Sequence, residues 1–239
     1  MTVNLLSDVA FVLHRYSYRE TSVIVELLTK HDGRVAVIAK GVRSAKSQLK
    51  GILQPFISLQ IQAKGRSQLK TLTLAEASGA PIILKDKAMF SALYMNELVY
   101  RLLPKEEACP HFFLMYHKSL LSLAMGQDVE KTLRFFEKDL LEAIGYGIAF
   151  DCVSDGHAPL NAEEKYSYYN EHGFVLAGLA STDEFVFSGS NLLAIAKDDY
   201  NSLETLKAAK RLFRMVLAPL LGGKPLKSRE LFMAKKLIS

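Results

Sequence analysis

Short runs of β-branched and aromatic residues dominate the first 80 positions of the chain, and some of them alternate between apolar and polar side chains. In the run 34–40, for example, Val35, Val37 and Ala39 share one face. A period of two is typical of a half-buried strand. We therefore predict five short strands, at 10–16, 22–29, 34–40, 57–64 and 69–77.

The connections between these runs indicate how the strands are joined. The sequence His-Asp-Gly at 31–33 supplies a hairpin turn between the second and third runs. Residues 44–51 are compatible with a helix that Gly51 can end. Five short strands with a helical insert after the third match the five-stranded Greek-key barrel of the OB-fold, although the strand count also fits an SH3-like barrel.

A helical period replaces the alternation after Pro81. Apolar side chains recur there at steps of three and four residues, which is typical of amphipathic helices. The predicted helices are 88–103, 111–124, 129–144, 189–197, 203–220 and 228–236. Ser190, Ser202 and Ser228 are the expected N-caps of the last three helices.

The fold class that follows is α+β, with an OB-fold barrel followed by an all-α helical domain. The expected domains are 1–80 for the barrel and 81–150 with 185–239 for the helical part. Residues 151–184 contain Gly156, Pro159, Gly173 and Gly178 and are predicted to form a loop-rich insert.

The charge of the chain is unevenly distributed. Residues 30–70 and 206–239 each hold nine basic side chains and one acid, whereas 81–205 hold ten basic and nineteen acidic residues. Like charges gathered in this way favour a polyanionic partner for the two ends, and the alternative is a set of solvated lysines.

The sequence contains no G-x-S-x-G, H-E-x-x-H or G-x-G-x-x-G motif. The stretch 222–228, Gly-Gly-Lys-Pro-Leu-Lys-Ser, resembles a phosphate-binding loop only superficially, because Pro225 follows the lysine and removes a backbone donor. The acids Glu137, Asp139 and Glu142 fit a solvated helix face better than a two-metal nuclease site. We therefore predict that the protein is not an enzyme and uses no cofactor, with a metal-dependent nucleic-acid-processing enzyme as an alternative.

No apolar run approaches the roughly 18–20 residues of a membrane helix, and the N-terminal stretch lacks a basic start. The expected location is the cytoplasm, with no membrane partner. In that compartment Cys109 and Cys152 are expected to be reduced thiols.

Two stretches carry a family likeness. Residues 19–56 contain E-T-S, L-T, G-R-V, A-K-G-V-R-S and L-Q-P-F in order, and residues 206–232 end in L-G-G-K-P-L-K-S-R-E-L-F. Both resemble the RecO family of bacterial recombination mediators, and 133–147 resembles the central helical region of that family more weakly. The resemblance implies an OB-fold, a helical domain and a small insert like a zinc finger.

The insert departs from those family members that hold zinc with four cysteines. Residues 151–184 offer only Cys152, with His157 and His172, and contain no C-x-x-C pair. Structural zinc needs four good ligands, so we predict no bound metal.

The resemblance also implies a function and partners. It implies binding to single- and double-stranded DNA, annealing of complementary strands without ATP, and action on DNA coated with single-stranded DNA-binding protein (SSB). It further implies contact with the SSB C-terminal tail and with RecR, and a functional link to RecA in nucleoid-associated DNA repair. A protein-interaction scaffold without DNA binding is the other alternative.

Phosphate contacts by basic side chains are expected to dominate DNA binding. The candidate DNA-binding residues are Arg34, Lys40, Arg43, Lys46, Lys50, Lys64, Arg66, Lys70, Arg211, Arg214, Lys224, Lys227 and Arg229. Tyr16, Tyr18 and Phe56 are the few candidates for base stacking, although strand aromatics usually pack inward.

The family position of the SSB-tail site matches Arg134, with Leu133, Leu141 and Ile144 as an apolar wall. Such a tail needs a cation for its carboxylate. The alternative is that Arg134 pairs with Asp128, Glu130 or Asp139 on a helix surface.

Overall fold

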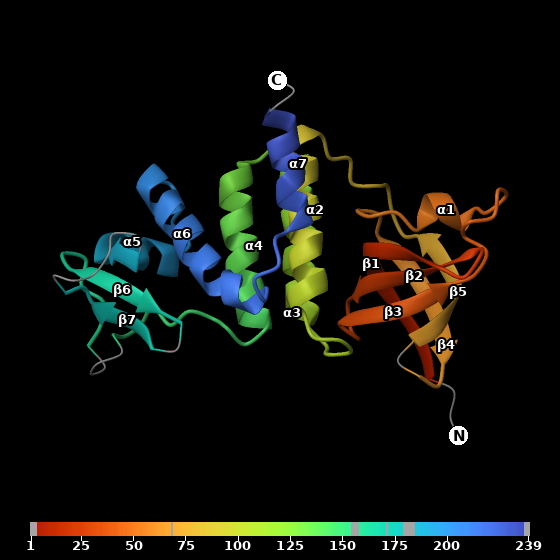
Figure 1. Cartoon of the computed structure of the whole chain (residues 1–239), viewed down its shortest axis with the longest axis horizontal. Coiled ribbons are helices and arrows are strands. Elements are labelled where there is room, and N and C mark those ends of the chain that lie inside the picture. The colour runs from red at the N-terminus through yellow and green to blue at the C-terminus, as the bar shows by residue number, and fades with distance from the viewer. Residues whose placement is uncertain (1–3, 68, 154–157, 171, 179–184, 237–239) are drawn as a thin grey trace. The chain divides into compact units, whose positions relative to one another are not determined.

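The computed structural model describes residues 4–67, 69–153, 158–170, 172–178 and 185–236, with side chains described up to residue 231 (Figure 1). The chain divides into two compact units. The first comprises Met1–Val129 and Pro225–Ser239, and the second comprises Glu130–Lys224.

Five strands of the first unit form a closed barrel (Figure 1). They are β1 (Asn4–Tyr18), β2 (Ser22–Thr29), β3 (Arg34–Ala39), β4 (Leu59–Gly65) and β5 (Leu69–Ala77). Their order around the barrel is β1-β2-β3-β5-β4, with β3 and β5 parallel and the other pairs antiparallel. This arrangement confirms the predicted OB-like barrel.

The barrel core explains the alternation in the sequence. Val35, Val37 and Ala39 point inward as predicted, and they pack in one apolar cluster with residues of all the other strands. Strand β2 is buried along its whole length, because its outward residues Glu26 and Leu28 are covered as well.

Several predicted boundaries are wrong. Strand β1 extends over Asn4–Tyr18 rather than 10–16, and its register shifts at a bulge between Val12 and His14. The insert after β3 forms only a short helix, α1 (Leu49–Ile52), rather than one over 44–51, because Ser44 closes a turn onto the Gly41 carbonyl. The bulge in β1 adds one unpaired residue to the strand without changing its composition, so the alternation in the sequence does not reveal it.

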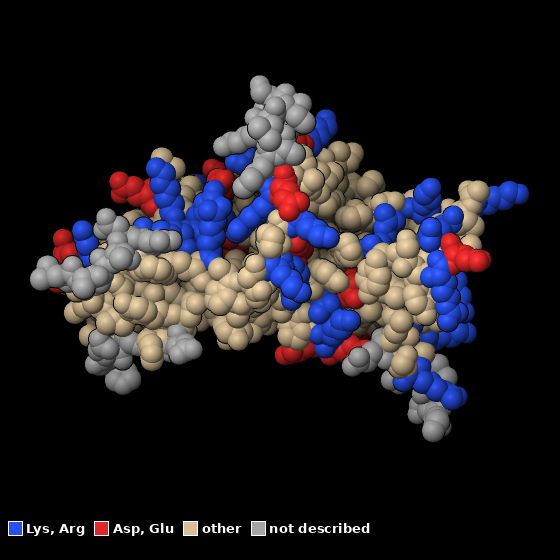
Figure 2. All heavy atoms as spheres, in the orientation of Figure 1, with Lys and Arg blue, Asp and Glu red and all other residues tan. Residues whose placement is uncertain are grey.

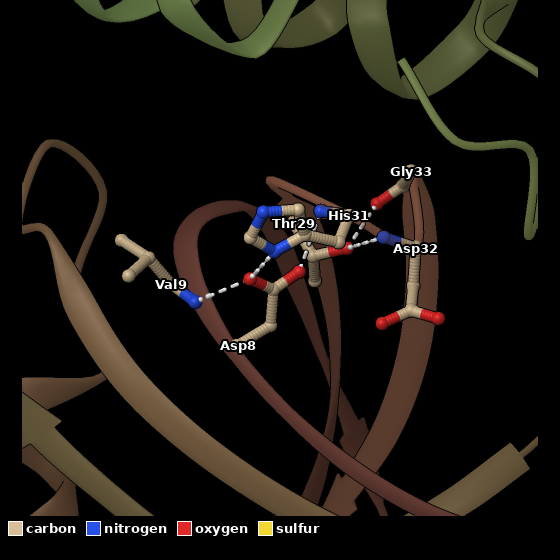
Figure 3. A network of polar contacts seen from close by, with 6 residues as sticks. All are labelled: Asp8, Val9, Thr29, His31, Asp32 and Gly33. Atoms are coloured by element: carbon tan, nitrogen blue, oxygen red, sulfur yellow. Dashed lines mark hydrogen bonds and ion pairs between the residues drawn. The ribbon is translucent and has the colours of Figure 1, made fainter. Parts of the chain in front are cut away.

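The predicted turn between β2 and β3 is present and is held by a buried acid (Figure 3). Asp8 accepts hydrogen bonds from the backbone N of Val9 and of His31, and its Oδ1 lies 2.8 Å from His31 Nδ1. The Thr29 hydroxyl donates to the Gly33 carbonyl at 2.8 Å. Asp8 on β1 therefore fixes the start of the turn.

Three helices complete the first unit: α2 (Asp86–Leu102), α3 (Pro110–Ala124) and α7 (Lys227–Lys236). Helix α7 lies along α2 (Figure 1). Phe11 of β1 contacts the rings of Phe113 and Tyr116 on α3, at centroid distances of 5.5 and 5.4 Å. The barrel and these helices thus share buried contacts.

The second unit contains α4 (Val129–Ala143, its first residue belonging to the first unit), α5 (Gly189–Ala196) and α6 (Leu203–Leu220). It also contains a sheet in the order β7-β6-β8, formed by β6 (Lys165–Tyr169), β7 (Gly173–Leu176) and β8 (Val186–Ser188). The loop-rich prediction for 151–184 is therefore wrong over β6 and β7. Tyr166, Tyr168 and Phe174 are buried, and their burial stabilises strands that the surrounding glycines concealed.

The helix caps agree with prediction at one of three positions. Ser202 caps α6 by accepting from the backbone N of Glu204. Ser188, not Ser190, caps α5, and Ser228 lies inside α7 rather than before it. Among the described residues, the helices are too short or too polar to cross a membrane.

Candidate nucleic-acid interface

Exposed basic residues gather where the barrel connects β3 to α1. Lys40, Arg43, Lys46 and Lys50 are all exposed, and none of them forms an ion pair in the described part of the chain. Figure 2 shows Lys and Arg side chains over this part of the barrel, around α1 and the neighbouring strands. Cations without carboxylate partners can contact phosphates without first breaking an ion pair.

The segment that carries them is anchored to the β1–β2 turn. The backbone N of Arg43 donates to the Thr21 carbonyl at 2.9 Å, and its guanidinium donates to the Arg19 carbonyl at 3.2 Å. Arg19 is itself exposed and lies over the Tyr18 ring at 5.2 Å. The sequence did not mark Arg19 as a candidate, because it lies outside the basic stretch 30–70. It contacts Arg43 of that stretch only in the folded protein.

Lys64 and Arg66, at the end of β4, are exposed as well. Lys64 pairs with Thr71 of β5, and Thr71 pairs with Ile38 of β3. Two strand spacings place Lys64 about 10 Å from Ile38, and Lys40 follows Ile38 by two residues, directly after the end of β3. The sheet register thus brings Lys64 near the end of β3 that carries Lys40.

Three of the predicted DNA-binding residues are instead held by partners within the protein. Arg34 pairs with buried Glu26 at 3.0 Å and donates to the Leu103 carbonyl at 2.8 Å. Lys70 pairs with Glu106 at 2.9 Å. The Arg211 guanidinium lies 4.3 Å from the Phe187 ring centre and donates to the Val186 carbonyl. A phosphate would have to compete with these contacts.

The C-terminal candidates divide between the two units. Arg211, Arg214 and Lys224 belong to the second unit, and Arg214 and Lys224 are exposed. Lys227 and Arg229 are exposed on α7, in the same unit as the barrel. Burial and the charge of Lys227 lower the pKa of His14 on β1.

Arg134 on α4 is buried, with 2% of its surface exposed. Its Nη2 donates to Glu137 Oε1 at 2.9 Å, so its ion-pair partner is Glu137 rather than Asp128, Glu130 or Asp139. Its Nε and Nη1 are buried and have no hydrogen-bond partner among the described residues. A further carboxylate can reach these two nitrogens only if the side chains that cover them move.

The apolar residues expected around Arg134 differ in how deeply they are buried. Leu133 and Leu141 are buried, and Ile144 is half-buried. Phe135, which the sequence did not single out, is 40% exposed and meets the Tyr200 ring edge-on at 4.9 Å. Phe135 therefore offers the accessible apolar surface on this helix that Leu141 does not.

Within the described ranges, no group of three or more His, Cys, Asp and Glu residues is arranged to hold a metal ion. Cys109 and Cys152 are free thiols. His157, one of the three potential ligands of the insert, lies outside the described residues.

Comparison with known proteins covers both units. Residues 1–80 match the family model "Recombination protein O N terminal", and residues 87–230 match "Recombination protein O C terminal". The DNA repair protein RecO of Pasteurella multocida is 44% identical over 224 residues, covering 93% of this chain and 92% of the relative. RecO of Methylococcus capsulatus is 42% identical over 227 residues, covering 95% and 93%.

RecO of Haemophilus influenzae is 45% identical over 223 residues, covering 93% of each chain. The names of these relatives describe DNA repair and name no catalytic activity. Matches of this identity and coverage, together with the OB-like barrel, identify the chain as a member of the RecO family of DNA repair proteins.

Proposed function

We propose that this protein is a recombination mediator that binds single- and double-stranded DNA through the barrel and anneals complementary strands without ATP. The observation that carries the proposal is the group of exposed cations Lys40, Arg43, Lys46 and Lys50, which lack carboxylate partners in the described residues. Lys64, Arg66 and Arg19 extend this surface on the barrel, and Lys227 and Arg229 add charge from α7.

The expected chemistry is electrostatic. Lysine and arginine contacts to phosphates displace condensed counterions, and they carry little sequence information. Two strands bound on one basic surface repel one another less than in solution, which favours annealing. In the cell this activity would act on SSB-coated DNA at the nucleoid, together with RecR, and prepare strands for RecA.

The first test is the salt dependence of DNA binding. Replacing Lys40, Arg43 and Lys46 together by Ala should lower the slope of log K against log salt by up to about 2–3 for duplex DNA, since each phosphate contact contributes about 0.9. The matched control replaces the exposed lysines Lys118 of α3, Lys165 of β6 and Lys197 at the end of α5, none of which belongs to a barrel strand, and should leave the slope unchanged. Equal slopes for the two triple variants would contradict the proposal that Lys40, Arg43 and Lys46 contact DNA.

The second test is function. Addition of the protein to SSB-coated complementary strands labelled with two dyes should accelerate annealing in the absence of nucleotide. The rate should fall as salt rises and should fall in the Lys40, Arg43 and Lys46 variant. A magnesium-dependent change in strand length would instead favour the nuclease alternative, and absence of DNA binding would favour an interaction scaffold.

A second site is proposed around Arg134 for the acidic C-terminal tail of SSB. The supporting observation is the pair of buried guanidinium nitrogens, Nε and Nη1, that lack a hydrogen-bond partner among the described residues. A terminal carboxylate could accept from this guanidinium, while an apolar side chain of the tail contacts Phe135. Apolar contact together with a bound carboxylate is a common mode of peptide recognition.

The test of this site must separate binding from folding. Arg134→Ala alone leaves Glu137 buried without its cation, so the double variant Arg134→Gln with Glu137→Gln is the better probe. The double variant should lose affinity for a labelled SSB-tail peptide while keeping its DNA affinity. The same peptide with an amidated C-terminus is the control on the ligand side. Unchanged peptide affinity in the double variant would show that Arg134 does not bind the SSB tail.

A further inference from the structure

A cavity of about 180 Å³ lies on the outer surface of the barrel. Ile24, Ala36 and Leu69 form its apolar lining, and they come from β2, β3 and β5. Tyr16, Arg34, Lys105 and Glu106 supply the remaining lining. This volume is well below the roughly 300–1,000 Å³ of sites for drug-sized ligands, so the cavity suits a single flat ring system.

The strand register explains why these side chains meet. Tyr16 pairs with Ile24 across β1 and β2, and Ala36 pairs with Leu69 across β3 and β5. Glu26 lies between these two pairs, opposite Ala36. The lining therefore rests on four neighbouring strands of a closed barrel, and rigid strands hold a binding site more accurately than loops do.

The remaining wall comes from the segment that follows α2. The backbone N of Glu106 donates to the Arg34 carbonyl at 2.9 Å, and Arg34 and Lys105 form a parallel bridge. Gly33 permits this approach, since a Cβ there would lie 1.8 Å from the Glu107 carbonyl oxygen. The segment is thus attached to β3 as part of the fold.

Polar groups hold the cavity's aromatic side chain in place. The Tyr16 hydroxyl lies 3.4 Å from Glu26 Oε1, and the Glu26 carboxylate also pairs with Arg34 at 3.0 Å and Lys105 at 3.6 Å. Glu26 is only 2% exposed, whereas Tyr16 remains 40% exposed. Tyr16 is therefore an accessible ring fixed at its hydroxyl end.

The cavity combines the features that recognise an unpaired nucleobase. An exposed aromatic ring can stack on any base, because every base has a π-face. Lys105 offers donors and the Glu106 carboxylate offers an acceptor, and base edges carry both kinds of group. Lys40 directly follows β3 and lies four residues, at most about 13 Å, from Ala36 along the chain, so the cavity is near the basic surface.

We propose that this cavity receives a base of single-stranded DNA, with Tyr16 as the stacking platform and Lys105 at its edge. The proposal rests on the proposed DNA-binding function and adds to it a distinction between strand types. A base held in a duplex is not free to enter, so the cavity contributes to single-strand binding alone.

The experiment compares three variants of the full-length protein, using a short single strand with one 2-aminopurine and a duplex of the same length. Tyr16→Ala should weaken single-strand binding about tenfold, within the range for loss of one base–aromatic stack, and leave duplex binding unchanged. Tyr16→Phe keeps the ring and should bind like wild type. Tyr169→Ala removes an exposed tyrosine of the second unit and is the matched control.

The 2-aminopurine fluorescence provides a direct readout of stacking. Quenching on binding should occur with wild type and Tyr16→Phe and should be lost with Tyr16→Ala. The pocket proposal is wrong if Tyr16→Ala weakens single-strand and duplex binding equally. It is also wrong if Tyr16→Ala weakens neither of them. If only its affinity for SSB falls, the cavity takes a protein side chain and the base proposal is likewise wrong.

The outcomes also separate this proposal from the one on which it rests. Loss of binding in the Lys40, Arg43 and Lys46 variant with normal behaviour of Tyr16→Ala would retain the phosphate surface and reject the pocket. Failure of the wild-type protein to bind either strand type would reject both.

Discussion

Glu97 of α2 accepts two hydrogen bonds from Ser228 of α7 through one carboxylate oxygen, from the backbone N at 2.8 Å and from the hydroxyl at 2.7 Å. Its other oxygen accepts from the backbone N of Lys227 at 3.0 Å. The first amides of a helix lack partners within the helix, and negative charge is favourable there. Glu97 therefore caps α7 from a neighbouring helix and fixes the position of Lys227.

This cap makes the attachment of α7 depend on pH. Burial raises the pKa of Glu97, but the hydrogen bonds from Ser228 and Lys227 outweigh it, and the net pKa lies below its ordinary value of 4.5. A carboxyl with a lowered folded-state pKa stabilises the fold fully above 4.5, and this contribution is lost as the pH falls through the lowered value. The protection of the Lys227 and Ser228 amides from hydrogen exchange, measured relative to their intrinsic rates, should therefore fall at acid pH.

The control for this prediction is Glu97→Gln, whose amide side chain has nearly the same size but does not ionise. It should weaken the attachment of α7 by about 1–2 kcal/mol at neutral pH, since the amide has only one acceptor oxygen, which is neutral, and its NH2 group cannot accept from the other donor. Its exchange at Lys227 and Ser228, corrected for intrinsic rates, should no longer respond to acid. An unchanged acid response would show that another group controls the helix.

Gly33→Ala is expected to destabilise the protein by at least about 3 kcal/mol. The residue has φ of +65°, which costs other residues about 1–2 kcal/mol, and its new Cβ would collide with the Glu107 carbonyl. Gly41→Ala is the matched control, because φ is +71° and nothing lies within 4 Å of its Cβ, so only about 1–2 kcal/mol should be lost. Urea unfolding of the two variants measures the difference, and equal losses would contradict the collision.

Asn96→Leu is expected to cost about 2–4 kcal/mol. The Asn96 amide donates to the Val12 and Leu13 carbonyls at the β1 bulge and accepts from the buried Tyr116 hydroxyl at 2.5 Å. Leucine would leave these buried groups without partners. Ser91→Ala is the control, since the buried Ser91 hydroxyl has no hydrogen-bond partner among the described residues. Thermal unfolding should shift clearly for Asn96→Leu and little for Ser91→Ala.

Arg134→Ala should cost about 3–5 kcal/mol, because Glu137 would remain buried without its ion-pair partner. The double variant Arg134→Gln with Glu137→Gln removes both charges and should be markedly more stable than Arg134→Ala. Chemical denaturation at neutral pH compares the two. A double variant no more stable than Arg134→Ala would show that the loss does not come from an unpaired Glu137 carboxylate.

Elements with strong local signals were predictable from the sequence. The runs 22–29 and 69–77 and the helix 203–220 match β2, β5 and α6 at both ends. Strands β6 and β7 were not predictable, because Tyr166, Tyr168 and Phe174 are stabilised by contacts formed only after the sheet assembles. Local propensity is a weak guide where tertiary packing decides the conformation.

The candidate sites show the same division. The basic composition of 30–70 marked Lys40, Arg43, Lys46 and Lys50, and exposure of these side chains agrees with a surface role. No pattern in the sequence showed that Arg34 and Lys70, unlike these four residues, form ion pairs within the protein. Their partners Glu26 and Glu106 come close to them only when the barrel closes and the segment after α2 packs on it.

The sequence by itself determined the strand alternation, the amphipathic helices, the charge distribution and the family. These properties depend on residues close together in the chain or on the order of residue types along it, so the sequence alone is enough to recognise them. The tertiary structure alone decided which cations are free and which are paired, that Lys227 joins the barrel unit, and that Tyr16 borders a cavity with Lys105. Burial and partner choice depend on residues far apart in the chain, and only folding brings those residues within contact distance.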